Sequence, residues 1–308
     1  MRQRPHLLVT DPANFEVSYA INPWMRPQAW LADPAAHRMA ARQSFDSLVQ
    51  ALEAAGAAVE VLAGAPGQPD MVFPANAAIV LNGRALMARF RCPERQGEEP
   101  AFLHAFERLR ARGALSEVIQ LPEGCLQEGA GDCIWDATRQ FFWVGFGPRS
   151  DADSPRVIAE VFGQEVVALE LATDEFYHLD TCFLPLSGGE VIYYPRAFTP
   201  EAREHIRRHV APGKLFEASE EDANGFCINA VNLGRKVVMA RATPGMRALL
   251  ARLGYVLTEV DLAPFILSGG AAYCMSLRLD RHDAPPAKDI HANPIAKEAE
   301  RHDILVGS

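Results

Sequence analysis

The sequence predicts an α/β fold in which five similar units, each a helix, a strand, a loop and a hairpin, are arranged cyclically. The first observation is a shared capping pattern at the helix starts. The second is a glycine after each helix, which recurs with a period of roughly 50 residues, a spacing typical of propellers and arrays. The third is a strand and a hairpin after each glycine. A doubly wound sheet with coincidental spacing is the alternative, but five units in the same order favour the ring.

Five helices are predicted, and four of them begin with a capping residue followed by a proline at the first helical position. These four starts are Asp33-Pro34, Ser154-Pro155, Thr199-Pro200 and Thr243-Pro244. The fifth helix begins at about Pro100, where apolar residues recur at helical spacing. The glycines suited to a left-handed helix end are Gly56, Gly113, Gly163, Gly213 and Gly254.

The strands follow the glycines. Single strands are predicted at residues 59–62, 118–121, 166–171, 215–218 and 255–260. Hairpins are predicted at residues 79–87, 133–146, 181–194 and 228–239. The fifth unit ends in one strand, residues 272–279, and the chain begins with another unpaired strand, residues 6–9. Pairing of these two strands would complete the fifth hairpin and close the ring.

Length and composition limit the class of protein. With 308 residues, of which 49% are hydrophobic, the chain can bury a large core. We expect a single catalytic domain at residues 1–281, followed by a C-terminal tail at residues 282–308. The tail contains Pro285-Pro286 and alternating charges. It is a candidate arm of a homo-oligomer.

Charge and cysteine usage narrow the partners. The formal net charge of −9 argues against nucleic acid and mildly suits a cationic small molecule. No stretch is apolar enough to span a membrane, and the first apolar run is too short for a signal peptide. The six cysteines include no CxxC pair. We therefore expect a cytoplasmic protein with reduced thiols, one of which is available as a nucleophile.

The loops between each single strand and the next hairpin contain the candidate site. If the units are equivalent, these loops converge at one end of the ring, although up to about 200 residues separate them. The titratable and amide side chains that four of them contribute are Asp70, Asn76, Glu128, Asp132, His178, Asp180 and Cys274, and the fourth unit contributes the loop from Asn224 to Asn229. If residues 179–186 continue as a strand, His178 and Asp180 lie on the same face, because side chains alternate with a period of two.

This set of side chains suits chemistry on a guanidinium group. A cysteine attacks as a thiolate, and a nearby histidine can protonate a leaving amine and then activate water. Glu128 could orient the imidazole, and Asp180 would supply a fixed negative charge. A guanidinium is a planar cation with five donors for carboxylates to bind. We therefore expect a small guanidino compound as the substrate.

Each residue also has an ordinary structural explanation: Cys274 as a core thiol, His178 as a strand-end residue, Glu128 and Asp132 as turn acids, and Asp180 as a cap. Their joint occurrence in equivalent loops weakens those explanations. His205 and His209 have the spacing of zinc ligands, but no third ligand accompanies them, so a solvated helix is favoured. We expect neither a metal nor a cofactor.

Several segments match a known family in order and combination. They are Ile-Asn-Pro-Trp-Met at 21–25, Pro-Asp-Met-Val-Phe-Pro-Ala-Asn at 69–76, Glu-Arg-Gln-Gly-Glu at 94–98, Glu-Gly-Ala-Gly-Asp at 128–132, His-Leu-Asp-Thr at 178–181, and Gly269-Gly270 before Cys274. The sequence thereby resembles the guanidino-group-modifying enzymes of the pentein superfamily. These include arginine deiminases, dimethylarginine dimethylaminohydrolases, arginine dihydrolases and amidinotransferases. The family fold is a five-fold pseudosymmetric α/β propeller.

The resemblance implies a role for each matching residue. Cys274 would attack the guanidinium carbon and hold a covalent amidino intermediate, and His178 would be the general acid and base. Glu128 and Asp180 would hold guanidinium nitrogens and support the histidine. The remaining residues of the expected substrate-binding set are Arg89, which would bind the substrate carboxylate, Asn22, Asn76, Asp70 and Asp132.

Two departures from the family pattern leave the reaction open. The acidic motif at 128–132 is one residue longer than the Glu-Gly-Gly-Asp of deiminases, which leaves open whether Glu128 or Asp132 supplies the catalytic carboxylate. Asn76 stands where deiminases and dimethylarginine enzymes usually carry an aspartate, and it is similar to arginine dihydrolases. Arginine or an N-methylated arginine could be the substrate, and citrulline or ornithine the product. An amidinotransferase and a non-catalytic guanidino-binding protein are the alternatives.

Overall fold

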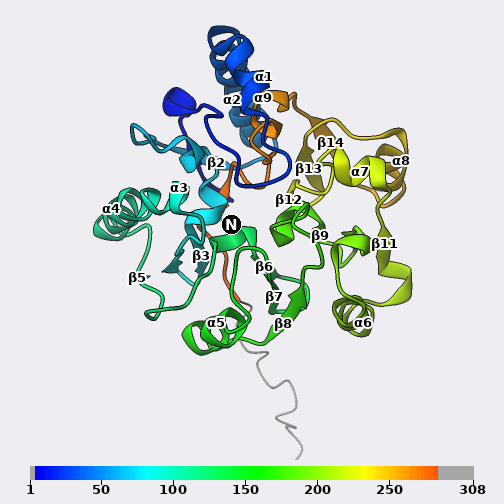
Figure 1. Ribbon diagram of the computed structural model, residues 1–308. Helices are drawn as coiled ribbons and strands as arrows, with labels where there is room; N and C mark the ends of the chain where they lie inside the picture. Colours follow the sequence, from blue (N-terminus) through cyan, green and yellow to red (C-terminus); the bar gives the residue numbers. More distant parts are fainter. Residues whose placement is uncertain (1–3, 284–308) are drawn as a thin grey trace, which may run out of the picture.

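The protein is a ring of five small sheets around a central axis, as Figure 1 shows for the computed structural model, which describes residues 4–283. The sheets are β15-β1-β2, β3-β4-β5, β6-β7-β8, β9-β10-β11 and β12-β13-β14. The middle strand of each sheet is antiparallel to its hairpin partner and parallel to the third strand. Helices α2, α4, α5, α6 and α8 lie on the outside of the ring (Figure 1). The predicted ring is confirmed.

The strands are short. Their bounds are β1 His6–Thr10, β2 Ala58–Leu62, β3 Ala78–Leu81, β4 Arg84–Met87, β5 Glu117–Ile119, β6 Cys133–Asp136, β7 Phe141–Phe146, β8 Val166–Glu170, β9 Phe183–Pro185, β10 Val191–Tyr193, β11 Leu215–Glu217, β12 Val231–Leu233, β13 Lys236–Met239, β14 Val256–Glu259 and β15 Leu277–Arg278. The chain ends close the ring as expected, because β1 pairs with β15 through Leu7↔Arg278 and Leu8↔Leu277.

The helix starts follow the capping pattern with one exception. The helices are α1 Pro27–Ala32, α2 Pro34–Ala54, α3 Pro93–Gln96, α4 Glu98–Ala111, α5 Ser154–Phe162, α6 Pro200–His209, α7 Glu220–Asn224, α8 Pro244–Arg252 and α9 Ala263–Ile266. The side chains of Asp33, Thr199 and Thr243 each accept a hydrogen bond from the third residue of the helix that follows. Ser154 does not cap α5, because it is already the first helical residue and Asp153 precedes it.

Four of the five predicted glycine ends adopt positive φ, namely Gly56, Gly113, Gly163 and Gly254. Gly213 was predicted wrongly. The helix α6 ends at His209, and Gly213 lies inside the 3-10 turn Pro212–Lys214, which needs no left-handed residue. The predicted hairpin turn at Asn82 and Gly83 has φ of 55° and 73°, as a two-residue turn between antiparallel strands requires.

Two predicted strands are wrong at the positions that matter for the site. Residues Leu179–Thr181 form a 3-10 turn, and β9 begins only at Phe183. The Asp132 carboxylate accepts the backbone N–H of Leu179 at 3.0 Å, and the Thr181 hydroxyl donates to the His178 carbonyl at 2.7 Å. The strand predicted at 272–279 is reduced to β15. In both places side-chain hydrogen bonds take the backbone groups that a strand would have paired.

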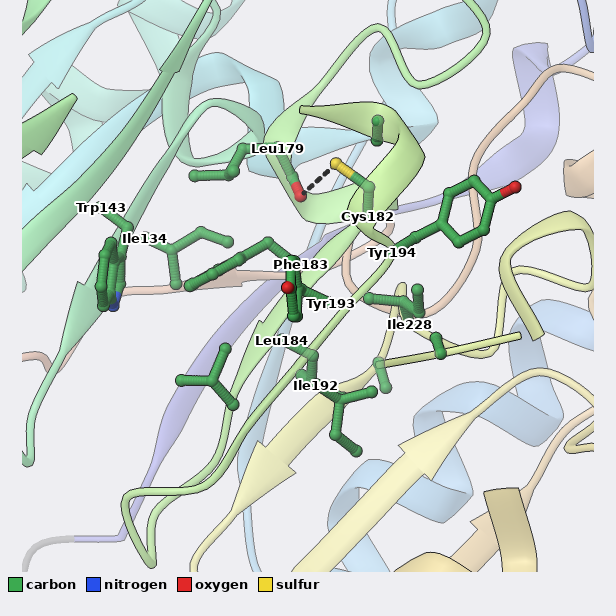
Figure 2. Close-up of a cluster of buried hydrophobic side chains, with 14 of the residues drawn as sticks. Ile134, Trp143, Leu179, Cys182, Phe183, Leu184, Ile192, Tyr193, Tyr194 and Ile228 are labelled. Carbon is green, nitrogen blue, oxygen red and sulfur yellow. Dashed lines mark hydrogen bonds between the residues drawn. The ribbon is translucent and has the colours of Figure 1, made fainter. Parts of the chain in front are cut away.

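The turn that carries His178 and Asp180 is anchored in the core between two sheets. Figure 2 shows Trp143 and Ile134 of the third sheet beside Phe183 and Ile192 of the fourth, all within one buried cluster. Leu179 is fully buried there, and the Cys182 thiol lies 3.5 Å from the Leu179 carbonyl oxygen, the contact drawn in Figure 2. Close packing on one side of this turn therefore fixes the polar side chains on the other side.

Two expectations about the chain as a whole concern its ends and membranes. The tail was predicted at residues 282–308, and the part of it after Asp283 lies outside the described residues. Its role and the domain boundary at residue 281 therefore stay predictions. Within residues 4–283, no helix combines the length and the apolar character that crossing a bilayer requires.

Candidate active site

The inner loops bring most of the predicted site residues together as buried side chains. Asp70, Asn76, Glu128, Asp132, His178, Asp180 and Cys274 are all at most 3% exposed. They come from 3-10 turns at Pro69–Val72, Pro74–Ala77, Gly129–Gly131 and Leu179–Thr181 and from the turn before β15. Burial of so many ionisable groups is expensive unless each is paired, so the hydrogen-bond partners define what the site can do.

His178 is held by a carboxylate on one side and an amide on the other. Its Nε2 lies 2.8 Å from Glu128 Oε2, and its Nδ1 lies 3.4 Å from Asn76 Nδ2. The amide orientation is fixed because Asn76 Oδ1 accepts from Arg95 Nη1 at 2.9 Å. Asn76 therefore presents N–H to Nδ1, and the neutral imidazole carries its proton on Nε2. Nδ1 is the nitrogen free to accept a proton.

Glu128 is held in its charged form. Arg149 Nη1 lies 3.3 Å from Oε2, and the backbone N–H of Arg91 donates to Oε1 at 3.1 Å. Burial by itself would raise the pKa of Glu128, but the His178 hydrogen bond and the Arg149 charge outweigh it and lower the pKa to about 2. The carboxylate is therefore ionised throughout the working pH range, and it can support a protonated His178.

Cys274 lies in a second network that does not include the histidine. Its Sγ is 3.0 Å from Asp180 Oδ2 and 3.0 Å from Asn229 Nδ2. Burial raises the pKa of the thiol well above its usual value, and the adjacent Asp180 charge raises it further. Burial likewise raises the pKa of Asp180 to about 7, although the bonds from Cys274 and Asn229 oppose the increase. Without a bound cation, Cys274 is a neutral thiol.

The two carboxylate oxygens of Asp180 differ in their hydrogen bonding. Its Oδ1 is buried and has no hydrogen-bond partner among residues 4–283, while Oδ2 faces the thiol. A buried carboxylate oxygen without a donor costs free energy, so an orphaned acceptor marks a place where a ligand N–H can bind.

Three other predicted residues act as connectors of the surrounding loops. Asp70 accepts the hydroxyl groups of Tyr19 and Ser268, both at 2.9 Å. Both carboxylate oxygens of Asp132 are also engaged, with Ser150 at 2.6 Å and with the turn that follows His178. Asn22 donates to the Ser268 carbonyl at 3.1 Å and caps its own loop.

Arg89 is the predicted residue that the structure does not bring to the others. Its guanidinium donates to the carbonyl oxygens of Leu121, Pro122 and Cys125. It forms no hydrogen bond with any other predicted site residue in the described part of the chain. Three of its five N–H donors are therefore directed at backbone carbonyls.

Sequence reasoning missed three residues that the structure places at the site. Arg95 pairs with Glu98 through two hydrogen bonds of 2.8 and 2.9 Å, and it lay unassigned inside the motif at 94–98. Asn229 lies in the loop of the fourth unit, which the repeat makes equivalent to the loops of the other site residues, and this equivalence could have identified it. Arg149 follows β7 without any motif, and it stacks 4.8 Å from the Tyr177 ring centroid.

Gly131 shows why the acidic motif contains glycine. A Cβ at this position would collide with the Asn76 amide nitrogen and lie 3.2 Å from His178 Nδ1. Only glycine lets the backbone pass beneath the Asn76–His178 contact. The spacing between Glu128 and Asp132 then lets Glu128 contact the imidazole of His178, while Asp132 accepts the backbone N–H of the next residue, Leu179.

In residues 4–283, no group of three or more His, Cys, Asp or Glu side chains could hold a metal ion. The zinc-like pair on α6 has a structural explanation, because His209 Nδ1 lies 2.8 Å from the His205 carbonyl and its ring packs against Phe141 and Trp143.

A five-fold α/β ring with a thiol, an imidazole and carboxylates at its centre defines a protein of the pentein superfamily. The chain belongs to the family described as N,N dimethylarginine dimethylhydrolase, eukaryotic, which matches residues 11–280. Both the fold and the family that the sequence motifs suggested are confirmed.

Two groups of relatives are similar to the chain. The bifunctional arginine dihydrolase/ornithine cyclodeaminase AgrE of Nostoc sp. is 37% identical over 293 residues, which are 95% of this chain and 40% of that protein. The chain thus spans about two-fifths of the length of such bifunctional relatives. The N(G),N(G)-dimethylarginine dimethylaminohydrolase of Mycobacterium tuberculosis is 35% identical over 271 residues, 88% of this chain and 84% of that one.

A solved structure has the same ring. The N-terminal domain of ArgZ with bound product, an arginine dihydrolase from cyanobacteria, is 37% identical and has a TM-score of 0.85. The match covers 92% of this chain and 100% of the ArgZ domain.

Proposed function

We propose that the protein is a cysteine-dependent hydrolase of the guanidino C–N bond of arginine or an N-methylated arginine. The observation that carries this proposal is the buried, unpartnered Oδ1 of Asp180 beside the Cys274 thiol. A guanidinium N–H would satisfy that oxygen and bring its carbon to the sulfur. Both the arginine dihydrolases and the dimethylarginine dimethylaminohydrolases among the relatives act on this group by name.

The reaction follows from the two networks. Cys274 Sγ bonds to the guanidinium carbon as the thiol proton passes to Nδ1 of neutral His178, and the cation itself favours that loss by offsetting the charge of Asp180. Protonated His178 then gives this proton to the leaving nitrogen, so the C–N bond breaks and ammonia or a methylamine departs. Neutral His178 next takes a proton from water, whose oxygen bonds to the amidino carbon. The C–S bond then breaks as the sulfur takes up a proton from the amidinium group, which releases citrulline and the thiol. A further hydrolysis, with loss of ammonia and carbon dioxide, would give ornithine.

The other residues bind and orient. Glu128 keeps the imidazole in place and stabilises its protonated form, which its low pKa permits. Asp180 and Asn76 would hold guanidinium nitrogens, and Asp70, Asp132 and Asn22 join the loops around them. We assign the substrate carboxylate to Arg149 in place of Arg89, because the Arg149 guanidinium contacts Glu128 within the site, whereas the Arg89 guanidinium lies among the carbonyl oxygens of residues 121–125.

Two further features complete the proposal. The cysteines in the described residues are free thiols, which fits a reducing compartment such as the cytoplasm. A homo-oligomer remains compatible with the chain. Asn76 stands where dimethylarginine enzymes usually carry an aspartate, as in the arginine dihydrolases that the sequence resembles, and this favours the dihydrolase reaction over methylarginine hydrolysis.

Product analysis tests the function. Arginine, monomethylarginine and asymmetric dimethylarginine would each be supplied, with and without glycine as an acceptor amine. We expect ornithine or citrulline without any new guanidino product, since the latter would indicate amidino transfer. Mass spectrometry should detect an amidino adduct on the peptide containing Cys274. Undiminished turnover by Cys274→Ser would overturn the proposal, and ligand binding without product would indicate a non-catalytic binding protein.

A further inference from the structure

Asn229 uses every hydrogen-bonding group of its side chain on the turn that carries Cys274 and on the adjacent Asp180. It is fully buried in the loop between α7 and β12. Its Oδ1 accepts the backbone N–H groups of Ala271, Tyr273 and Cys274 at 3.1, 3.1 and 3.2 Å. Its Nδ2 donates to the Asp180 carbonyl oxygen at 3.1 Å and to Cys274 Sγ at 3.0 Å.

These contacts fix which end of the amide faces the sulfur. A reversed amide would direct N–H groups at three backbone N–H donors and an oxygen at the Asp180 carbonyl. Such an arrangement would leave the N–H groups of Ala271 and Cys274 and the Asp180 carbonyl without a proper partner, so the orientation with Nδ2 toward the sulfur is the satisfied one. Cys274 Sγ therefore faces an N–H donor.

The two neighbours of the sulfur act in opposite directions. A neutral thiol can donate its proton to Asp180 and accept from Asn229 at the same time. A thiolate loses the bond to Asp180 and is repelled by its charge, but it keeps the bond from Asn229. Arg149 and His178 belong to the other network, and neither forms a hydrogen bond to Sγ within the described residues.

We propose that Asn229 is a catalytic residue whose amide N–H stabilises the Cys274 thiolate, while its carbonyl oxygen holds the turn that presents the thiol. This inference rests on the proposed function, in which Cys274 is the nucleophile. The donor is neutral, so it favours the thiolate without competing with the substrate cation for Asp180. A lysine or a second histidine in this position would repel that cation.

The variant Asn229→Asp separates the two roles of the side chain, donation of a hydrogen bond to Cys274 Sγ and support of the turn at residues 271–274. The carboxylate keeps an oxygen for the three backbone N–H groups, which would stabilise its charge, but it removes the N–H that faces the sulfur. Asn229→Ser removes the whole amide, both the N–H that faces the sulfur and the oxygen that holds the turn, without adding charge. Ser276→Ala is the matched control, because the Ser276 hydroxyl donates to the Ala272 carbonyl of the same turn at 3.0 Å and does not contact Sγ.

The readout is the rate at which iodoacetamide alkylates Cys274, measured by mass spectrometry of its peptide across pH. A hydrogen bond to a charged group implies alkylation about 10- to 100-fold slower near neutral pH in Asn229→Asp and Asn229→Ser, with the apparent thiol pKa raised by about 1 to 2. The Ser276→Ala protein should keep the wild-type pH profile. Circular dichroism checks that each variant is folded.

A wild-type pH profile in both folded Asn229 variants would overturn the inference and leave Asn229 a structural residue. If neither variant folds, NMR of the wild-type protein replaces them. The Asn229 side-chain amide resonances should then titrate with the apparent pKa of alkylation, and their failure to do so would overturn the inference. Alkylation needs no turnover, so a protein that makes no product from arginine could still confirm the donor.

Discussion

The two halves of the site differ in how much charge they carry before a ligand arrives. In the histidine half, Glu128, Arg149 and His178 form an ion-paired network, and the pKa of Glu128 is lowered to about 2. In the cysteine half, burial raises the pKa of Asp180 to about 7, and burial together with the adjacent Asp180 charge raises that of Cys274 well above its usual value. One half is charged and ion-paired, whereas the other holds a neutral thiol beside a carboxyl with a pKa of about 7 and has an acceptor oxygen without a partner in the described residues.

This difference assigns separate tasks to the two halves. A paired, ionised network is rigid and can move a proton without being rearranged. A buried carboxyl and thiol respond strongly to an added cation, because the cation offsets both the cost of burying a charge and the repulsion between the carboxylate and a thiolate. Substitutions that remove charge should therefore damage the histidine half, but in the cysteine half they should increase thiol reactivity while abolishing binding.

The largest effect is expected from Glu128→Gln. Loss of the carboxylate removes the support for protonated His178 and leaves Arg149 without its buried partner, so kcat should fall about 10²- to 10³-fold. Steady-state kinetics with the preferred substrate would measure it. Glu99→Gln is the control, because the Glu99 carboxylate accepts a hydrogen bond of 2.8 Å from the Phe90 N–H and not from His178. The kcat of this variant should change little. An unchanged kcat in Glu128→Gln would refute the division of tasks.

Asp180→Asn should change turnover and thiol reactivity in opposite directions. Turnover should fall about 10²-fold or more because the cation loses its carboxylate. Alkylation of Cys274 at neutral pH should become faster, since the negative charge that raises the thiol pKa is gone. Asp174→Asn, at an exposed position two residues before Phe176, is the control. Slower alkylation in Asp180→Asn would contradict the electrostatic account.

The same substitution should also affect stability as a function of pH. Burial raises the pKa of Asp180 from 3.8 to about 7, so its stabilising contribution is full below the unfolded value and is lost as the pH rises through about 7. The thermal midpoint of Asp180→Asn should therefore exceed that of the wild type at about pH 8 and approach it at about pH 4. Thermal unfolding followed at both pH values measures this, and an equal difference at both would argue against a buried, titrating carboxyl.

The ring was predictable because its signals are local. Capping residues such as Thr199 and Thr243, left-handed glycines such as Gly163, and the Asn82-Gly83 turn act within a few residues. Their repetition then determined the order of the units. Equivalence of the loops placed Cys274, His178 and Glu128 together before any contact was known.

The turns within the site could not be predicted in this way. A 3-10 turn replaces a strand after His178 because Asp132, 47 residues away, accepts the Leu179 N–H. The turn at Cys274 depends on Asn229, 45 residues away. Arg149 lies outside the loops that the repeat equates. In both turns a side chain distant in the sequence determines the local backbone geometry. Hydrophobic periodicity does not indicate such a hydrogen bond.

The smallest effect is expected from a pair of arginine substitutions. Arg149→Lys keeps a positive charge but loses the planar donor group that contacts both Glu128 and the Ile21 carbonyl, so KM should rise about 10-fold, with a smaller fall in kcat. Arg89→Lys should leave KM unchanged and lower thermal stability, because the carbonyls at 121–125 lose hydrogen bonds. A KM increase confined to Arg89→Lys would restore the role that the sequence motifs gave to Arg89, and it would move the carboxylate site to the 121–125 loop. The two variants also show what the Arg149–Glu128 ion pair does. If Arg149→Lys and Arg89→Lys change KM alone, the ion pair serves substrate binding, and proton transfer depends on Glu128 and His178 without Arg149.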